Sequence, residues 1–307
     1  MAEIVANRNL PRAHPWAFVA LLVGNLALAG GPFLVRHSGV GPISAGFWRL
    51  ALALPFLWLI ARMAKQPVDW PKRAVTVAIL FAAAFFAADL AAWHAGIELT
   101  KLGNATLFGN LSSFLFAAWG LWLIRKWPSL VQAVALALAA LGCGLLMYGS
   151  AELSAAHLRG DLLSALAGLL YTGYLILVER TRGTVKPVPL LFIASLFGAA
   201  LLLPAAIVSG EQVVPADWTG LVALALCSQV VGQGLLVYAL GHVPPLVVGI
   251  AMLTQPALSA LLGWLYYGES FTPLDWTGAA MIVVALVLVK RPDSGPPNLR
   301  AEAPVPK

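Results

Sequence analysis

Two residues that are charged at neutral pH, Arg49 and Asp89, fall well inside long apolar stretches of this sequence. A charge in lipid costs several kcal/mol unless it faces a protein interior or finds a partner. At 1.5 Å per helical residue, both lie at a similar depth, roughly 7 to 9 Å below one membrane surface. A shared depth permits an ion pair, in which Arg49 has a structural role, either with Asp89 or by reaching the interface. In the other interpretation, Asp89 faces a cavity and receives a substrate ammonium group or a coupling proton.

Aromatic residues accompany Asp89 on its helical face. Phe86 precedes it by three positions and Trp93 follows it by four, so the three side chains share one side of a helix. A carboxylate beside an indole suits a cationic amine with an apolar body, through charge pairing and cation-π attraction. The alternative is that these rings belong to the aromatic belt found near membrane interfaces.

Amide side chains inside other apolar stretches are further candidates for binding. Gln229 and Gln233 are four residues apart with Gly232 between them, and two amides on one face bind a carboxylate or a hydroxyl group, or else tie helices together. Asn25 lies near mid-membrane and Asn110 in the outer part of another stretch. A buried amide needs a partner, so we place both at the substrate site.

Three more residues complete the predicted site. Tyr171 and Tyr174, one turn apart, form an aromatic wall with hydroxyl groups or simply pack in the core. Pro256 frees a backbone carbonyl inside an apolar stretch and is our hinge candidate. Gly232 allows close approach and is the second hinge candidate.

The elements that position these residues are ten apolar stretches, each long enough to cross a hydrocarbon core of about 30 Å as a helix. They cover residues 16–35, 44–61, 74–96, 103–124, 130–148, 160–178, 189–209, 217–240, 244–267 and 272–289. Hydrophobic residues make up 60% of the chain and charged residues 10%, with a mean hydropathy of +0.86. This composition excludes a water-soluble domain. The sequence predicts an all-α membrane protein with ten transmembrane helices.

The distribution of basic residues predicts the orientation. Of the 19 lysines and arginines, three lie in the loops of one side (Arg36, Lys101 and Arg159), Arg49 lies inside a stretch, and the remaining fifteen lie on the other side. The positive-inside rule therefore places both termini in the cytoplasm. It also explains the net charge of +6 without a nucleic-acid partner.

The two halves of the chain match weakly when the sequence is displaced by about 143 residues. We expect a cytoplasmic tail at 1–15, a first five-helix repeat at 16–148, a second at 160–290, and a disordered cytoplasmic tail at 291–307. Since five crossings per repeat is an odd number, the second repeat must be inverted relative to the first. Inverted repeats are a recurring transporter architecture, with the substrate near mid-membrane and each half able to rock against the other.

At this level the sequence resembles the drug/metabolite transporter superfamily and, within it, the EamA-type exporters. The motifs that carry the resemblance are Pro42 to Pro55 around Arg49, Ala95-Gly96-Ile97 to Gly103, Tyr238-Ala239-Leu240, Gln255-Pro256, and Gly268-Glu269 followed by Asp275 to Gly278. The first half departs from the pattern, because Ser113 stands opposite Pro256 and Arg125-Lys126 opposite Gly268-Glu269. Asp89 makes the chain resemble bacterial exporters of aromatic and other neutral amino acids.

The resemblance implies a carrier in a bacterial-type inner membrane that exports small metabolites, above all neutral or aromatic amino acids, by alternating access. A nucleotide-sugar, sugar or drug carrier of the same architecture is the alternative within this class. An intramembrane enzyme or a channel is the alternative from another class, but the sequence has no G-x-S-x-G, H-E-x-x-H or Walker A motif and no polar stripe along a pore. We expect a monomer with no catalytic residues, metal or cofactor.

Overall fold

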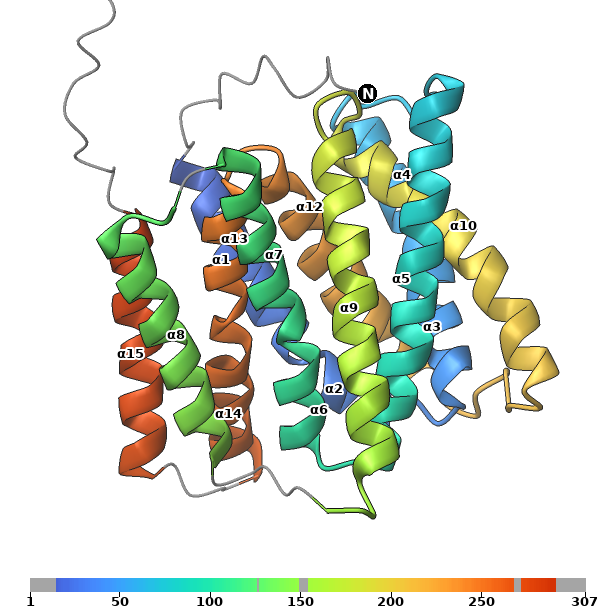
Figure 1. The fold of residues 1–307 in the computed structure, drawn as a ribbon. Coiled ribbons are helices and arrows are strands. Elements are labelled where there is room, and N and C mark those ends of the chain that lie inside the picture. Colours follow the sequence, from blue (N-terminus) through green and yellow to red (C-terminus); the bar gives the residue numbers. More distant parts are fainter. Residues whose placement is uncertain (1–14, 126, 149–153, 268–271, 291–307) are drawn as a thin grey trace, which may run out of the picture.

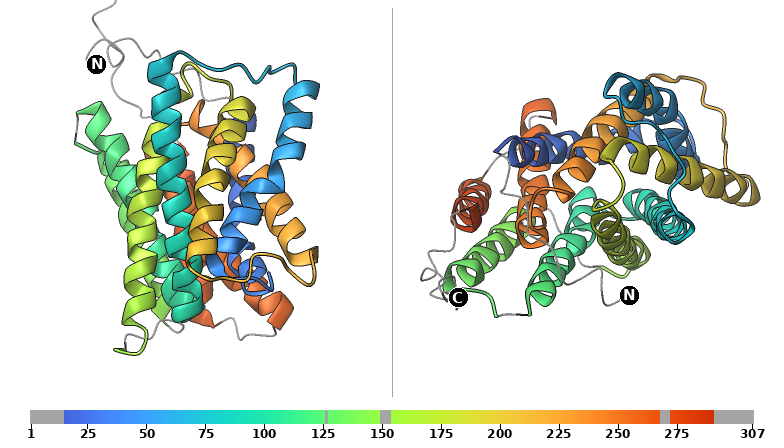
Figure 2. Two further views of the ribbon diagram at one scale, coloured as in Figure 1. Left: turned by 90° about the vertical axis from the view of Figure 1, so that its right-hand side faces the viewer. Right: turned by 90° about the horizontal axis from the view of Figure 1, so that it is seen from above.

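The computed structural model describes residues 15–125, 127–148, 154–267 and 272–290, and within these ranges every regular element is a helix (Figure 1). The predicted tails, and the Gly268-Glu269 pair of the family motif, lie outside the described residues apart from Pro15. The helices run lengthwise side by side as a bundle (Figure 2).

The first half of the chain contains three interrupted helical stretches and two continuous ones. Its elements are α1 (Pro15–Ala29) and α2 (Gly31–Arg36), α3 (Pro42–Ala51) and α4 (Ala53–Met63), α5 (Arg73–Leu99), α6 (Leu102–Gly109) and α7 (Leu111–Ile124), and α8 (Leu130–Tyr148). Single residues, namely Gly30, Leu52 and Asn110, separate the paired elements.

The second half has a different pattern of interruptions. Its elements are α9 (Leu158–Thr181), α10 (Pro187–Val208), α11 (Thr219–Ala223), the π-helical stretch η1 (Leu224–Gln233), α12 (Gly234–Leu240), α13 (Pro245–Met252), α14 (Thr254–Tyr267) and α15 (Pro273–Lys290). A π-helix is wider than an α-helix, and such stretches occur frequently at functional sites.

In the described ranges, eight helical stretches between Trp16 and Leu240 are long and apolar enough to cross a membrane, and two shorter apolar helices follow, Pro245–Leu258 and Pro273–Val289. Only 33 to 50% of the most apolar part of each long stretch is buried. Large apolar side chains such as Phe81, Leu141 and Val283 point outward, as expected of a protein surrounded by lipid. The all-helical, multi-pass architecture is thus confirmed, while the count of ten crossings stays a prediction.

Helices from the two halves pack against each other throughout the bundle. α5 packs along α9, α8 along α15, α7 along α13, and α3 along α10 (Figures 1 and 2). At the α8/α15 crossing a Cβ atom on Gly142 would lie 2.6 Å from the Gly278 carbonyl oxygen, and one on Gly278 would lie 2.6 Å from that of Gly142. Such close approach requires glycine on both sides, a common device where lipid supplies no hydrophobic drive for association.

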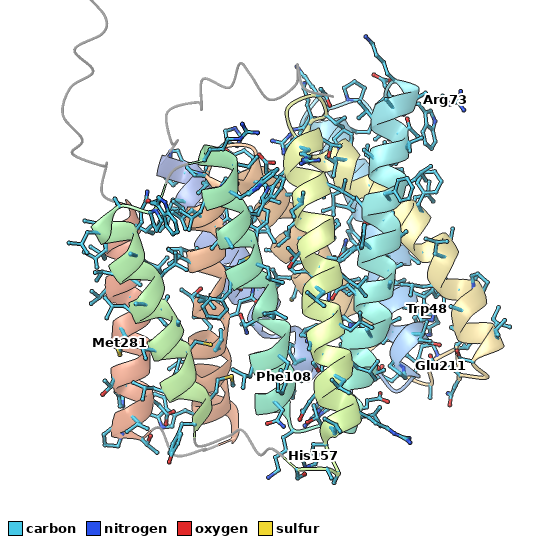
Figure 3. All side chains as sticks on the ribbon, viewed as in Figure 1. Trp48, Arg73, Phe108, His157, Glu211 and Met281 are labelled. Carbon is cyan, nitrogen blue, oxygen red and sulfur yellow. The ribbon has the colours of Figure 1, made fainter. Side chains whose placement is uncertain are left out.

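The loops at one end of the bundle tie the halves together. Figure 3 places Arg73 at one end of the molecule and His157 and Glu211 at the other. There the Glu211 carboxylate accepts hydrogen bonds from the backbone amides of Ile43 (3.1 Å) and Ser44 (2.8 Å) in the first turn of α3. These free amides and the helix dipole favour an anion, so Glu211 holds the start of α3 in place.

The bend predicted at Pro256 lies three residues earlier, at Leu253, between α13 and α14. Proline lacks the N–H that would bond to the Met252 carbonyl, and Pro256 lies in the first turn of α14, where this N–H is not required. Although Ser113 replaces the proline in the first half, that half is broken too, at Asn110. The two breaks are 143 residues apart, the displacement found from the sequence.

Candidate functional site

A cavity of about 80 Å³ lies between helices of the two halves. Its polar lining consists mainly of six side chains, namely Arg49, Asp89, Asn110, Tyr171, Gln233 and Gln255. Apolar residues such as Leu28, Phe86, Trp93 and Met252 form the rest of the wall. The lining comes from α1, α2, α3, α5, the α6/α7 and α13/α14 breaks, α9 and η1.

Asp89 lines this cavity. It lies in the C-terminal part of α5 and is 7% exposed. Among the described residues no hydrogen bond or ion pair reaches its carboxylate. Trp93, one turn further along α5, lines the same cavity. The predicted neighbourhood of Asp89 and Trp93 is therefore present, and the carboxylate is open to a solute.

Arg49 lines the cavity as well but does not pair with Asp89. Its side chain is 3% exposed, and Nε donates a hydrogen bond to Gln229 Oε1 at 3.3 Å. The guanidinium carbon lies 5.8 Å from the centre of the Phe86 ring. Within the described part of the chain, no Arg49 nitrogen lies within 4 Å of an Asp89 oxygen. The ion pair that the shared depth permits is thus not formed here.

Gln229 supports Arg49 and does not line the cavity. It is fully buried, and its Nε2 donates to Ser195 Oγ at 3.0 Å. Arg49, Gln229 and Ser195 therefore form one hydrogen-bonded chain across α3, η1 and α10. Ser195 is absent from the sequence prediction, and its only signal is that it is the single polar residue of α10.

Gln233 lies one π-helical turn from Gln229 and reaches the cavity. Its Nε2 donates to the Tyr171 hydroxyl at 2.8 Å, so the amide and the phenol form one polar wall. The Tyr171 and Tyr174 rings are stacked with centroids 5.6 Å apart, and Tyr174 also stacks on Phe86 at 4.4 Å. Tyr174 is fully buried and absent from the cavity lining, which agrees with the core-packing interpretation.

Asn25 lies at the break between α13 and α14, outside the cavity lining. Its Nδ2 donates to the Ala251 carbonyl at 2.8 Å, and its Oδ1 accepts from Gln255 Nε2 at 3.2 Å. Thr254 Oγ1 also donates to the Ala251 carbonyl, at 2.6 Å. Asn25 therefore satisfies a carbonyl freed by the break and positions Gln255, which does line the cavity and which the predicted site lacks.

The break in the first half is satisfied locally. Asn110 Nδ2 donates to the Thr106 carbonyl at 2.7 Å, and Ser112 Oγ donates to the Gly109 carbonyl at 2.9 Å. Asn110 Oδ1 accepts from Ser113 Oγ at 3.4 Å. Asn110 lines the cavity as predicted, but much of its hydrogen-bonding capacity is used by the bend itself.

Gly232 lies where η1 meets α1. A Cβ atom there would lie 2.9 Å from Leu28 Cγ, so a larger residue would push the two helices apart. The close approach predicted for this glycine is thus present, while its role as a hinge stays a prediction. No group of three metal-binding side chains occurs in the parts of the chain that the structure describes.

Comparison with known proteins shows a match over nearly the whole chain. The family model for EamA-like transporters matches twice, at residues 15–148 and 158–291. Both ends of the second match are displaced by 143 residues from those of the first, as positions 15 and 158 and positions 148 and 291 show. The same model thus describes both halves.

Individual relatives are more distant. The chain is 27% identical over 287 residues to the threonine/homoserine exporter RhtA of Escherichia coli (strain K12), covering 91% of this chain and 92% of the exporter. It is 25% identical over 276 residues to an uncharacterized transporter of Archaeoglobus fulgidus, covering 89% and 93%. A crystal structure of a protein 18% identical in sequence superposes with a TM-score of 0.72, over 90% of this chain and 96% of the other. That last match shows the fold alone.

Proposed function

Because this chain belongs to the EamA-like transporter family, we propose that it is a secondary transporter that exports neutral amino acids, small ones above all. In this proposal ten helices form two inverted five-helix repeats, both termini lie in the cytoplasm, and the solute crosses a bacterial-type inner membrane by alternating access. The coarser statement, a multi-pass membrane transporter, follows from the family and from the apolar helices.

The observation that carries the substrate class is the unpartnered carboxylate of Asp89. In a wall of low dielectric constant, a carboxylate without a protein partner is unfavourable unless a cation or a proton joins it. A substrate ammonium group next to Trp93 meets this need through charge pairing and cation-π attraction. This pairing requires a protonated amine in the substrate.

The size of the cavity supports a small solute. Sites for drug-sized ligands span about 300 to 1,000 Å³, whereas this cavity has about 80 Å³. Small hydroxylated amino acids, the class named for the Escherichia coli relative, fit that size better than aromatic ones. The hydroxyl and amide groups of Tyr171, Gln233 and Gln255 offer hydrogen bonds to such a side chain.

The duplicated sequence supports the mode of transport. Two segments that match one family model, each with five predicted crossings, must have opposite orientations in the bilayer. A cavity where inverted repeats meet is opened to alternate sides by rocking of one repeat against the other. The excess of basic residues on the side of the termini supports cytoplasmic termini.

The test is counterflow into liposomes that contain the purified protein. Labelled threonine, homoserine and phenylalanine are compared with glucose and a nucleotide sugar, for wild type, Asp89→Asn and the exposed-loop control Asp69→Asn. We expect wild type and Asp69→Asn to move threonine and homoserine, and Asp89→Asn to lose this transport. Movement of a sugar or nucleotide sugar without any amino acid would contradict the proposal.

A further inference from the structure

Arg49 has unused hydrogen-bond donors in the cavity that Asp89 lines. Only Nε of its guanidinium makes a hydrogen bond, the one to Gln229. Among the described residues the two terminal nitrogens, Nη1 and Nη2, make none, although the side chain is 97% buried (3% exposed). Within the described part of the chain no carboxylate hydrogen-bonds to this buried guanidinium, an unfavourable arrangement that the carboxylate of a ligand would relieve.

Arg49 and Asp89 have side chains of opposite formal charge and line one cavity, and among the described residues no hydrogen bond or ion pair joins them. Arg49 is the single basic residue and Asp89 the single acidic residue of the cavity lining among the residues that the structure describes. A molecule with an ammonium group at one end and a carboxylate at the other would satisfy both at once. A simple amine leaves the guanidinium unpaired, and a simple carboxylate leaves Asp89 unpaired.

The neighbours of Arg49 hold its guanidinium in one orientation. The chain from Ser195 through Gln229 restrains Nε from the side of α10 and η1. On another side the Phe86 ring lies 5.8 Å from the guanidinium carbon, in cation-π range. The planar fork of Nη1 and Nη2 remains available, and this group matches a carboxylate with two parallel hydrogen bonds.

We propose that Arg49 binds the α-carboxylate of the substrate, and that Gln229 and Ser195 are positioning residues that hold its guanidinium for this task. This inference rests on the proposed function and adds a second half to its recognition: Asp89 selects the ammonium group and Arg49 the carboxylate. The carrier therefore recognises free zwitterionic amino acids and rejects analogues that carry one charge.

The first test needs no substitution. Counterflow of labelled threonine by wild-type protein is measured against unlabelled threonine, threoninamide and 2,3-dihydroxybutanoate, which offer both charges, the ammonium alone and the carboxylate alone. We expect competition by threonine and at least tenfold weaker competition by each analogue. Equal competition by threoninamide would overturn the role of Arg49 while leaving the proposed function intact. If wild type moves no amino acid at all, the proposed function and this inference fail together.

The second test separates positioning from binding. Arg49→Gln is expected to raise KM for threonine at least tenfold and to remove the preference for threonine over threoninamide. Ser195→Ala keeps Arg49 but frees Gln229, so we expect a threefold to tenfold rise in KM with little change in the maximal rate. Arg62→Gln, in which the replaced arginine lies over the exposed Trp58 ring, is the matched control and is expected to behave as wild type. An unchanged preference for threonine over threoninamide in Arg49→Gln would overturn the proposal.

Discussion

The helix that carries Asp89 and its counterpart in the second half are built differently. α5 is a continuous α-helix from Arg73 to Leu99. Displacement by 143 residues places it opposite α11, η1 and α12, which contain ten π-helical residues and no charged side chain. Asp89 then falls opposite Gly232, and Arg49 opposite Phe192. The duplicated framework is thus shared, while the charged groups of the cavity come from the first half and the glutamines Gln229, Gln233 and Gln255 from the second.

The two helix breaks also differ between the halves, in the residues that satisfy the freed backbone carbonyl groups. In the first half, Asn110 and Ser112 satisfy the freed carbonyls from within the same segment. In the second half, Asn25 comes from α1, more than 220 residues away, to satisfy the Ala251 carbonyl. Hydrogen bonds within the same segment thus satisfy the first bend, whereas in the second a long-range contact from Asn25 adds to the local hydrogen bond of Thr254.

The largest effect is expected when the charged side chain of Asp89, which the first half contributes to the cavity, is removed. For Asp89→Ala we expect about a 10- to 100-fold loss in kcat/KM for threonine, since hydrogen bonds to charged groups contribute about 1.5 to 3 kcal/mol. Counterflow in liposomes measures the effect. Retention of wild-type kinetics would mean that Asp89 does not bind substrate.

The long-range support of the second-half break is the next target. Asn25→Leu leaves the buried Ala251 carbonyl with Thr254 alone and frees the Gln255 amide. We expect destabilisation by about 1 to 3 kcal/mol, the cost of an unsatisfied buried polar group, read as a lower melting temperature in detergent. Asp69→Asn, in an exposed loop away from the cavity, serves as the comparison. Equal melting temperatures for Asn25→Leu and wild type would show that the second break is as self-sufficient as the first.

We expect substitution of Gln233 to reduce transport less than substitution of Asp89. Gln233→Leu removes the hydrogen bond to Tyr171, and a neutral hydrogen bond contributes about 0.5 to 1.5 kcal/mol. We expect KM for threonine to rise by about two- to tenfold, with the maximal rate kept. A loss of transport larger than that of Asp89→Ala would show that Gln233, and not Asp89, makes the stronger contribution to substrate binding.

The smallest effect is expected from the proline. Pro256→Ala restores an N–H in the first turn of α14, where it is not needed for helix formation, so the break supported by Asn25 should persist. We expect a change in transport rate of roughly threefold or less, corresponding to below about 1 kcal/mol. Pro204→Ala, inside the continuous α10, is the matched control. Complete loss of transport in Pro256→Ala alone would make the proline itself the hinge.

The sequence indicates a cavity residue where a polar or aromatic side chain is unusual for its apolar surroundings. Asp89, Trp93, Asn110, Tyr171 and Gln233 were predicted from polar or aromatic groups in apolar stretches, and all five line the cavity. The EamA resemblance and the helical, multi-pass fold were likewise readable, because apolar length and family motifs are local properties.

The sequence alone does not predict contacts between segments that are far apart in the chain. The roles of Gln229, Ser195 and Asn25 depend on which helices meet in the bundle, and single-sequence patterns contain no such information. The π-helical stretch gives no signal in hydrophobic periodicity over so few residues. A shared depth permits an ion pair between Arg49 and Asp89, but depth does not specify the directions in which the two side chains point, and both line the cavity without pairing among the described residues.

The most direct measurement of the central claim is equilibrium binding of threonine to the purified wild-type protein by calorimetry, followed by threoninamide and 2,3-dihydroxybutanoate under the same conditions. If one zwitterion bridges Arg49 and Asp89, threonine binds and each singly charged analogue binds at least tenfold more weakly. Binding of either analogue as tight as that of threonine would contradict the account.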